Sequence, residues 1–167
     1  MAFQFYMNLK GKTQGSLKGQ STKSGKGNVS SKGVLCHAFN YAVQTQYDAG
    51  TGHPSGKRQH KPIVITKEVD SSSPSLYHAL ATGEGFTSVT LSFVKPDAGG
   101  KEVVFKTIEL TNASISKIDY AQPYKGNRSQ SITLVYEEVA VDGAKNGAIS
   151  HSLLAPATTG AAGGKTA

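Results

Sequence analysis

Short segments in which apolar and polar residues alternate, separated by turn signals, constrain this chain more than any other feature. Residues 3–9 place Phe3, Phe5, Met7 and Leu9 on one face, as a half-buried strand does. Further segments with the composition or alternation of strands are residues 34–46, 63–67, 87–95, 102–110, 114–121 and 131–141, the last being the clearest. Strands at a spacing of roughly ten residues favour a small closed antiparallel structure. We therefore predict an all-β, mainly antiparallel fold, either a compact β-barrel or a closed sandwich.

One short segment carries helical signals, and it predicts a single α-helix at about residues 74–82. Ser73 is suited to the N-cap, Pro74 to the first helical position, and Gly83 to the C-terminal end. Leu76 and Leu80 are four residues apart, with Tyr77 beside them, which gives one apolar face. A helix of this length is marginal alone, so we expect it to pack against the sheet and close one end of the barrel.

The length of 167 residues fits one domain, which we place at residues 1–154. Residues 155–167 are rich in Gly, Ala and Thr and are predicted to form a disordered tail. The N-terminus has no basic and apolar signal-peptide pattern, and we find no candidate membrane span. Residues 10–32 contain six lysines and no acid, a pattern that suits either solvated loops or contact with nucleic acid or an anionic membrane.

Tests for chemistry give no catalytic, cofactor-binding or metal site. The five histidines lack the helical or Cys/His spacing of a zinc site. Cys36 and His37 are neighbours on a strand, so we expect their side chains to point to opposite faces. Glu137 and Glu138 diverge for the same reason, and no Gly-x-Ser-x-Gly elbow occurs. We therefore predict a protein that is not an enzyme and needs no cofactor.

A series of motifs links these segments to a known family. The chain has Gly-x-Pro-Ser-Gly-x-Arg-x-His-x-Pro at residues 52–62, Thr-Lys-Glu-x-Asp at 66–70, Ser-Pro-x-Leu-Tyr-x-Ala-Leu at 73–80, and Gly-Glu at 83–84. Gly-Lys-Thr-Gln-Gly at 11–15 fits an early turn. In residue type and order these motifs resemble the Hcp family, the secreted tube proteins of bacterial type VI secretion systems. The resemblance covers most of the chain up to about residue 141, and it is weak in residues 16–32.

The resemblance implies how such a protein works. Hcp-like proteins form hexameric rings that stack into a tube, a sheath propels the tube out of the cell, and effectors travel in its lumen. The expected partners are other copies of the chain and the sheath, spike and effector proteins, with no nucleic acid and no membrane insertion. The expected location is the bacterial cytoplasm before firing, followed by secretion without a cleaved signal peptide.

Residues 47–61 form a long Gly-rich, basic loop, and loops of this length are usually functional or disordered. We expect this loop to contact another subunit or ring, with a mobile loop that has no partner as the alternative. A second polar contact is expected nearby, although a local salt bridge or a stabilised turn is an equal alternative there. The candidate interface residues are Tyr47, Asp48, Gly52, Pro54, Ser55, Gly56, Arg58 and His60 in the loop, and Lys67, Glu68 and Asp70 in the second contact.

Three other functions compete with a tube protein. A nucleic-acid-binding β-barrel would use the lysines of residues 10–32 and bind with strong salt dependence. An effector adaptor would share the fold but would not polymerise. A toxic effector domain fused to a tube protein is disfavoured, because the residues after Val141 are too few for a catalytic domain.

Overall fold

The computed structural model describes residues 4–19, 33–122, 125–143 and 146–152, and most of these lie in strands. The strands are β1 (Phe5–Gly11), β2 (Gly15–Leu17), β3 (Val34–Cys36), β4 (Ala38–Asn40), β5 (Val43–Gln44), β6 (Gln59–His60), β7 (Ile63–Glu68), β8 (Gly85–Pro96), β9 (Glu102–Ala121), β10 (Ser129–Val135), β11 (Glu138–Gly143) and β12 (Asn146–Ser152). The helix α1 spans Ser73–Thr82. The predicted tail, residues 155–167, lies outside the described residues, as does most of the lysine-rich segment.

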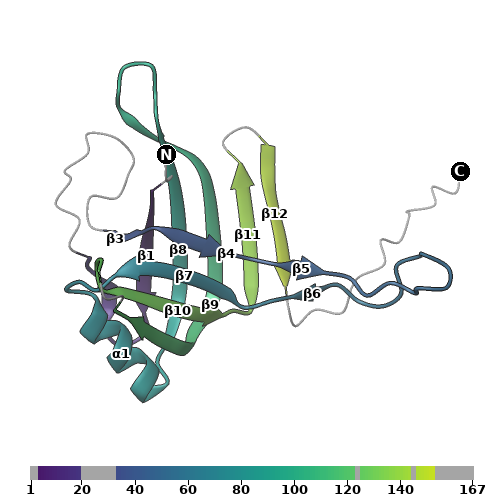
Figure 1. Ribbon diagram of the computed structural model, residues 1–167, viewed down its shortest axis with the longest axis horizontal. Helices are drawn as coiled ribbons and strands as arrows, with labels where there is room; N and C mark the ends of the chain where they lie inside the picture. Colours follow the sequence, from purple (N-terminus) through teal and green to yellow (C-terminus); the bar gives the residue numbers. More distant parts are fainter. Residues whose placement is uncertain (1–3, 20–32, 123–124, 144–145, 153–167) are drawn as a thin grey trace, which may run out of the picture.

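Two runs of strands share β9. One run, which we call the long sheet, has the order β2–β1–β8–β9–β11–β12, and the other continues from β9 through β10 and β7 to β4 (Figure 1). All of these pairs are antiparallel. The predicted all-β, mainly antiparallel class with one short helix is therefore confirmed.

The prediction that the sheet closes needs correction, because the sheet is compact but is not a closed barrel. The segment that would close it is divided between the two sheet edges. Its first half, β3, pairs with β1, and its second half, β4, pairs with β7. His37 lies between the halves and donates its backbone N–H to Thr66 O at 2.9 Å. The two edges are thus linked by one chain segment that changes partner.

The apolar faces of both runs point inward and form one core. Its largest fully buried side chains include Phe5, Phe86, Met7, Leu91 and Ile132. Phe5 stacks on Phe93 with a ring-centroid distance of 4.8 Å, and both rings form T-shaped contacts with Phe39. Burying this apolar surface stabilises the body by about 25 cal/mol per Å² removed from water.

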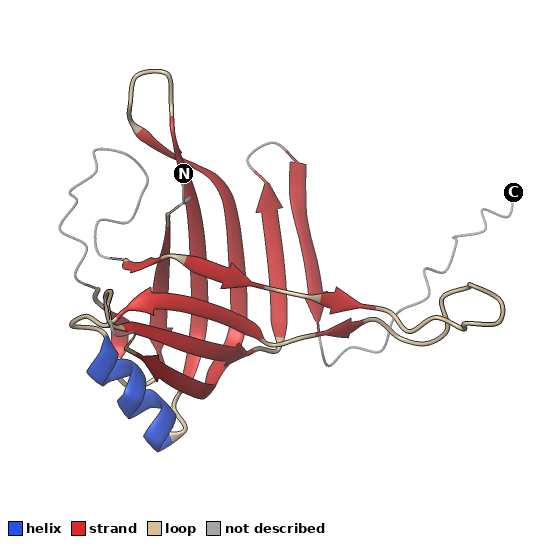
Figure 2. Ribbon diagram, in the orientation of Figure 1, coloured by secondary structure: helices blue, strands red, loops and turns tan. Residues whose placement is uncertain are grey.

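Helix α1 lies at one end of the strands (Figure 2) and is fixed there by its buried residues Leu76 and Ala79. Gly83 ends the helix as predicted, with a φ of 67° in the left-handed region that glycine tolerates. The start differs from the prediction, since the N-cap is Ser72 and Ser73 is the first helical residue. Tyr77 does not share the apolar face, because 59% of it is exposed.

Two strand boundaries also differ from the sequence prediction. Residues 111–113 do not separate two strands, since β9 runs through them with Asn112 at a φ of 48°. At this point β9 changes its partner from β11 to β10. The predicted strand 131–141 is instead divided into β10 and β11, with Tyr136 buried at the break. Both differences arise because the long strand β9 pairs with β11 along one part of its length and with β10 along the other.

Candidate functional site

Residues 41–62, which we call the arm, form an ordered extension rather than an irregular loop. At its base β5 and β6 pair as a separate two-stranded sheet, with Val43 opposite His60. Farther out, Tyr47 and Pro54 form an isolated bridge, and Ser55 donates its backbone N–H to Gln46 O at 2.8 Å. Figure 1 shows the arm reaching away from the body of the protein.

The tip of the arm is a tight turn built on Asp48. Its side chain accepts the backbone N–H of Gly50 at 2.8 Å, and its carbonyl accepts that of Gly52 at 2.8 Å. Gly52 has a φ of 69° and Gly56 a φ of 104°, which other residues rarely adopt. The glycines predicted at the interface therefore shape the arm itself.

The arm offers exposed apolar and aromatic surface. Tyr47 is 72% exposed and Val43 is 44% exposed, and the side chains between them are also exposed. A tyrosine presents a large apolar ring with a polar tip, which suits contact with another protein surface. The exposure of Tyr47 on a projecting ribbon favours a partner at this place.

The root of the arm is held by a short chain of polar contacts. Tyr41 Oη lies 2.9 Å from His60 Nδ1, and the two rings are stacked. Arg58 Nε donates to His60 Nε2 at 3.1 Å, so in the neutral ring the proton resides on Nδ1 and faces Tyr41. On the other side, Tyr136 Oη donates to Lys61 O at 3.0 Å. Arg58 and His60, which were predicted to contact a partner, contact each other and Tyr41 at the root of the arm.

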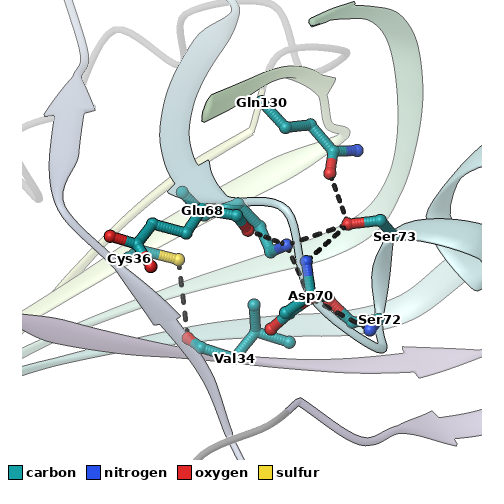
Figure 3. A network of polar contacts seen from close by, with 8 residues as sticks. Val34, Cys36, Glu68, Asp70, Ser72, Ser73 and Gln130 are labelled. Atoms are coloured by element: carbon teal, nitrogen blue, oxygen red, sulfur yellow. Dashed lines mark hydrogen bonds and ion pairs between the residues drawn. The ribbon is translucent and has the colours of Figure 1, made fainter. Parts of the chain in front are cut away.

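In the second predicted contact Lys67 is buried, Asp70 is partly buried and Glu68 is exposed. Lys67 Nζ donates to Asp70 Oδ1 and to Glu68 O, both at 2.7 Å. Figure 3 shows Glu68 and Asp70 in this network beside Ser72, Ser73 and Gln130. Burial acts to raise the pKa of Asp70, but hydrogen bonds from Lys67 and Ser72 outweigh it and hold the pKa below its ordinary value. The local salt bridge, one of the two alternatives for this segment, is what the structure shows for Lys67 and Asp70.

The same network ties helix α1 to strand β10. Ser73 Oγ donates to Gln130 Oε1 at 2.7 Å and accepts the backbone N–H of Asp70 at 3.1 Å. Gln130 is fully buried, and its Nε2 has no hydrogen-bond partner within the described part of the chain. The hydroxyl of Ser73 therefore acts in the interior, and Ser72 at the N-cap makes no side-chain cap hydrogen bond.

Glu68 is the residue of this trio that stays at the surface. Its Oε1 accepts a hydrogen bond from Asn127 Nδ2 at 2.7 Å and lies 3.8 Å from His37 Nε2. His37 is partly exposed whereas Cys36 is fully buried, so the prediction that these neighbours point to opposite faces is confirmed. Burial raises the pKa of the Cys36 thiol to about 12, which makes it a poor nucleophile.

Two motif segments far apart in the sequence meet through Glu84. Its Oε1 accepts the backbone N–H groups of Thr13 at 2.7 Å and Gln14 at 2.9 Å, and its Oε2 accepts Gln14 Nε2 at 2.8 Å. The hydrogen bonds from Gln14 and Thr13 hold the pKa of Glu84 below its ordinary value. A Cβ at Gly11 would lie 2.6 Å from Glu84 Oε1, so a larger residue there would displace the Glu84 carboxylate from this position. Sequence reasoning identified both segments but missed their contact.

Searches of the described residues for other chemistry give two findings. They contain no group of three or more His, Cys, Asp or Glu residues placed to hold a metal ion. No helix among them has the length and apolar content needed to cross a membrane. The exposed aromatic and apolar surface of the arm makes it the strongest candidate functional feature.

Comparisons with known proteins agree on one family. Residues 6–142 match the model of a family described as type VI secretion system effector, Hcp. The chain is 37% identical over 126 residues to the "Major exported protein" of Pseudomonas aeruginosa, a match that covers 72% of this chain and 73% of that protein.

Solved structures of this kind share the fold. The crystal structure of an Hcp protein superposes with a TM-score of 0.81 at 26% identity, covering 89% of this chain and 98% of that one. The Hcp1 protein from the E. coli pathovar EAEC 042 gives a TM-score of 0.77 at 27% identity, covering 90% and 99%. The secreted protein Hcp3 from Pseudomonas aeruginosa gives 0.72 at 25% identity, covering 90% and 98%.

Proposed function

Because this chain belongs to the Hcp family of type VI secretion system proteins, we propose that its copies assemble into hexameric rings that stack into the inner tube of the apparatus. The rings are secreted with the tube and carry effectors in their lumen. The role is structural rather than enzymatic, and the partners are other copies of the chain together with sheath, spike and effector proteins.

The arm is the observation that carries this proposal. It is an ordered ribbon with exposed Tyr47 and Val43, and its direction is fixed by the contacts of His60 at its root. An extension without a partner would gain little from such ordering, since fixing a backbone residue costs about 1–2 kcal/mol of conformational entropy. We infer that the arm contacts a neighbouring ring or subunit through Tyr47, Asp48, Pro54 and Ser55.

The location follows from the same proposal. A relative bears the name of an exported protein. We propose that this protein resides in the bacterial cytoplasm until the apparatus fires and leaves the cell without a cleaved signal peptide. Mass spectrometry of the secreted protein, read at its N-terminus, tests this, because a cleaved form would contradict it.

Negative-stain electron microscopy of the purified wild-type protein tests the assembly. We expect sixfold rings, and tubes at high protein concentration. A population of monomers at every concentration would contradict the proposal and favour the non-polymerising adaptor. Retardation of an oligonucleotide at low salt, lost at high salt, would instead favour the nucleic-acid-binding alternative.

A further inference from the structure

At the root of the arm, the two ring nitrogens of His60 have different hydrogen-bonding roles. Arg58 Nε donates to His60 Nε2 at 3.1 Å, and Tyr41 Oη lies 2.9 Å from His60 Nδ1. A guanidinium group can only donate hydrogen bonds, so His60 Nε2 is an acceptor and carries no proton. The proton of the neutral ring is then on Nδ1, where it faces Tyr41. The observed contact with Arg58 therefore requires a neutral His60.

Protonation of His60 removes the acceptor that Arg58 uses. In the imidazolium form both ring nitrogens donate, so the N–H of Nε2 would point at the N–H of Arg58 Nε, with two positive charges side by side. The contact with Tyr41 survives, because Nδ1 carries a proton in both forms. Arg58 directly precedes β6 on the outward side, so its contact ties the outer part of the arm to the root. Acid therefore breaks this tie and leaves the rest of the root in place.

The charge of this cluster changes near neutral pH through His60, because an imidazole ordinarily titrates near pH 6.5. Burial raises the pKa of Tyr41 and of Tyr136 above their ordinary value, so both phenols stay neutral in this range. Tyr136 packs against Tyr41 with a ring-centroid distance of 6.5 Å and donates to Lys61 O at 3.0 Å. The charged neighbours on the arm are Arg58 and, at the next position, the exposed Lys61. Both are cations, and neither stabilises an imidazolium.

The arm depends on its root because its own base is short. Strands β5 and β6 pair through only Val43 with His60 and Gln44 with Gln59. Beyond them the ribbon projects from the body and carries Tyr47, which is 72% exposed (Figure 1). A looser root lets Tyr47 sample more orientations in the free protein. Docking must then order more freedom, and this lowers the affinity of the arm for its partner.

We propose that protonation of His60 releases Arg58 and loosens the arm, so that acid weakens the stacking of rings. The inference rests on the proposed function and adds a pH dependence to the contact made by the arm. Stacking is strongest while His60 is neutral and is lost as the pH falls through the titration of this residue. A proposed ring presents six arms, so a loss of about twofold at each arm multiplies to more than tenfold for the ring.

Nuclear magnetic resonance of arginine labelled with ¹⁵N tests the contact itself, without the need for stacking. The chain contains two arginines, Arg58 and Arg128, and the variant Arg58→Gln assigns their Nε–Hε signals. We expect the Arg58 signal of the wild type to shift between pH 7.5 and pH 5.5. It should not shift in His60→Gln, because the amide oxygen of glutamine accepts a hydrogen bond at either pH. A wild-type Arg58 signal that is the same at both pH values would overturn the inference.

Light scattering at the same two pH values and constant ionic strength tests the consequence for stacking. We expect the concentration at which wild-type rings stack to rise by about tenfold or more at pH 5.5, and that of His60→Gln to change by less than about twofold. His53→Gln is the matched control, since His53 is an exposed histidine of the same arm, and it should keep the wild-type pH dependence. Arg58→Gln, at an exposed position, removes the repulsion and should also lose the pH dependence, which keeps the test decisive if His60→Gln does not fold.

The outcomes separate this inference from the proposed function. Wild-type rings that stack equally well at both pH values would overturn the inference and leave the proposed function intact. A pH dependence that persists in His60→Gln would also overturn it, because another group would then be responsible. A wild-type protein that forms no rings at either pH would overturn the proposed function and the effect on stacking, while the Arg58 signal would still show whether the root of the arm responds to acid.

Discussion

Two polar regions of this molecule are close in sequence, but they differ in where their side chains find contacts. Around Lys67, the ammonium group is fully buried and all of its hydrogen-bond partners come from the same chain. Along the arm, Tyr47 and its neighbours are exposed, and most contacts of the ribbon are made by its own backbone. The polar groups around Lys67 find their hydrogen-bond partners when the chain folds. The arm instead exposes surface that only another molecule can cover.

This difference separates stability from assembly. Residues near Lys67 should govern whether the body folds, because a buried charge without its partner is costly. Residues of the arm should govern whether copies associate, because they contribute little to the core. Changes in each region therefore have distinct expected readouts.

The largest expected effect is on stability, from Asp70→Ala. This change leaves the Lys67 ammonium buried without its carboxylate, and we expect the free energy of unfolding to fall by about 3–5 kcal/mol. Urea denaturation followed by circular dichroism measures it. Lys67→Met is the matched comparison and should cost less, since it removes the buried charge itself. A loss below about 1 kcal/mol for Asp70→Ala would show that the network does not hold the body together.

Acid should weaken the same network. The pKa of Asp70 lies below its ordinary value of 3.8 in the folded state, so the unfolded chain takes up this proton first as the pH falls. The stabilisation is complete above the unfolded pKa and is lost as the pH falls through the lowered folded pKa. Unfolding free energies of the wild type should therefore drop more steeply below about pH 4 than those of Asp70→Asn. Parallel pH curves would exclude this contribution.

Gln130→Met should have a smaller effect. The substitution removes the hydrogen bond with Ser73, but it also removes the buried Nε2 that has no partner in the described chain. An unsatisfied buried group costs about 1–3 kcal/mol, so we expect a net change within about 1 kcal/mol. Gln130→Ala is the control and should lose more, because it leaves a cavity. Equal losses of stability for the two variants would mean that the hydrogen bonding of the Gln130 amide contributes more to stability than the volume of the side chain does.

How far the sequence alone leads can be judged from single residues. Gly83 was identified correctly as the helix end, because a left-handed C-cap is a local demand that glycine meets by itself. Leu76 was placed correctly in the core through its helical spacing. Ser73 and Tyr77 were misplaced, since the buried amide of Gln130 and the position of the sheet decide where their side chains go.

The strand boundaries failed for a related reason. Neither the continuation of β9 through Asn112 nor the break at Tyr136 follows from nearby residues, because both depend on where β9 changes its partner. The arm was predicted either to contact another subunit or to be a mobile loop, and its ordered pairing was not predicted. Lys67 was predicted to lie either in a contact with a neighbour or in a local salt bridge or turn, and it is the fold that brings Asp70 and Ser73 to it.

The smallest expected effect on stability belongs to Tyr47→Ala. The side chain is 72% exposed, so the free energy of unfolding should change by no more than about 0.5 kcal/mol. Tyr77→Ala is a matched control, as Tyr77 is 59% exposed but lies on helix α1. We expect Tyr47→Ala to weaken ring stacking and Tyr77→Ala to leave it unchanged, as measured by light scattering. Equal stacking by both variants would remove Tyr47 from the contact.

Shortening the arm tests most directly whether this region serves assembly alone. Tyr47 and Pro54 already face each other across the ribbon, so residues 48–53 can be replaced by Asn-Gly, which favours a tight two-residue turn. We measure tubes by electron microscopy and stability by urea denaturation on the same preparation. We expect wild-type stability with tubes lost or much shortened. Normal tubes from the shortened protein, or a body that no longer folds, would contradict the division between a self-sufficient core and an arm that contacts a neighbour.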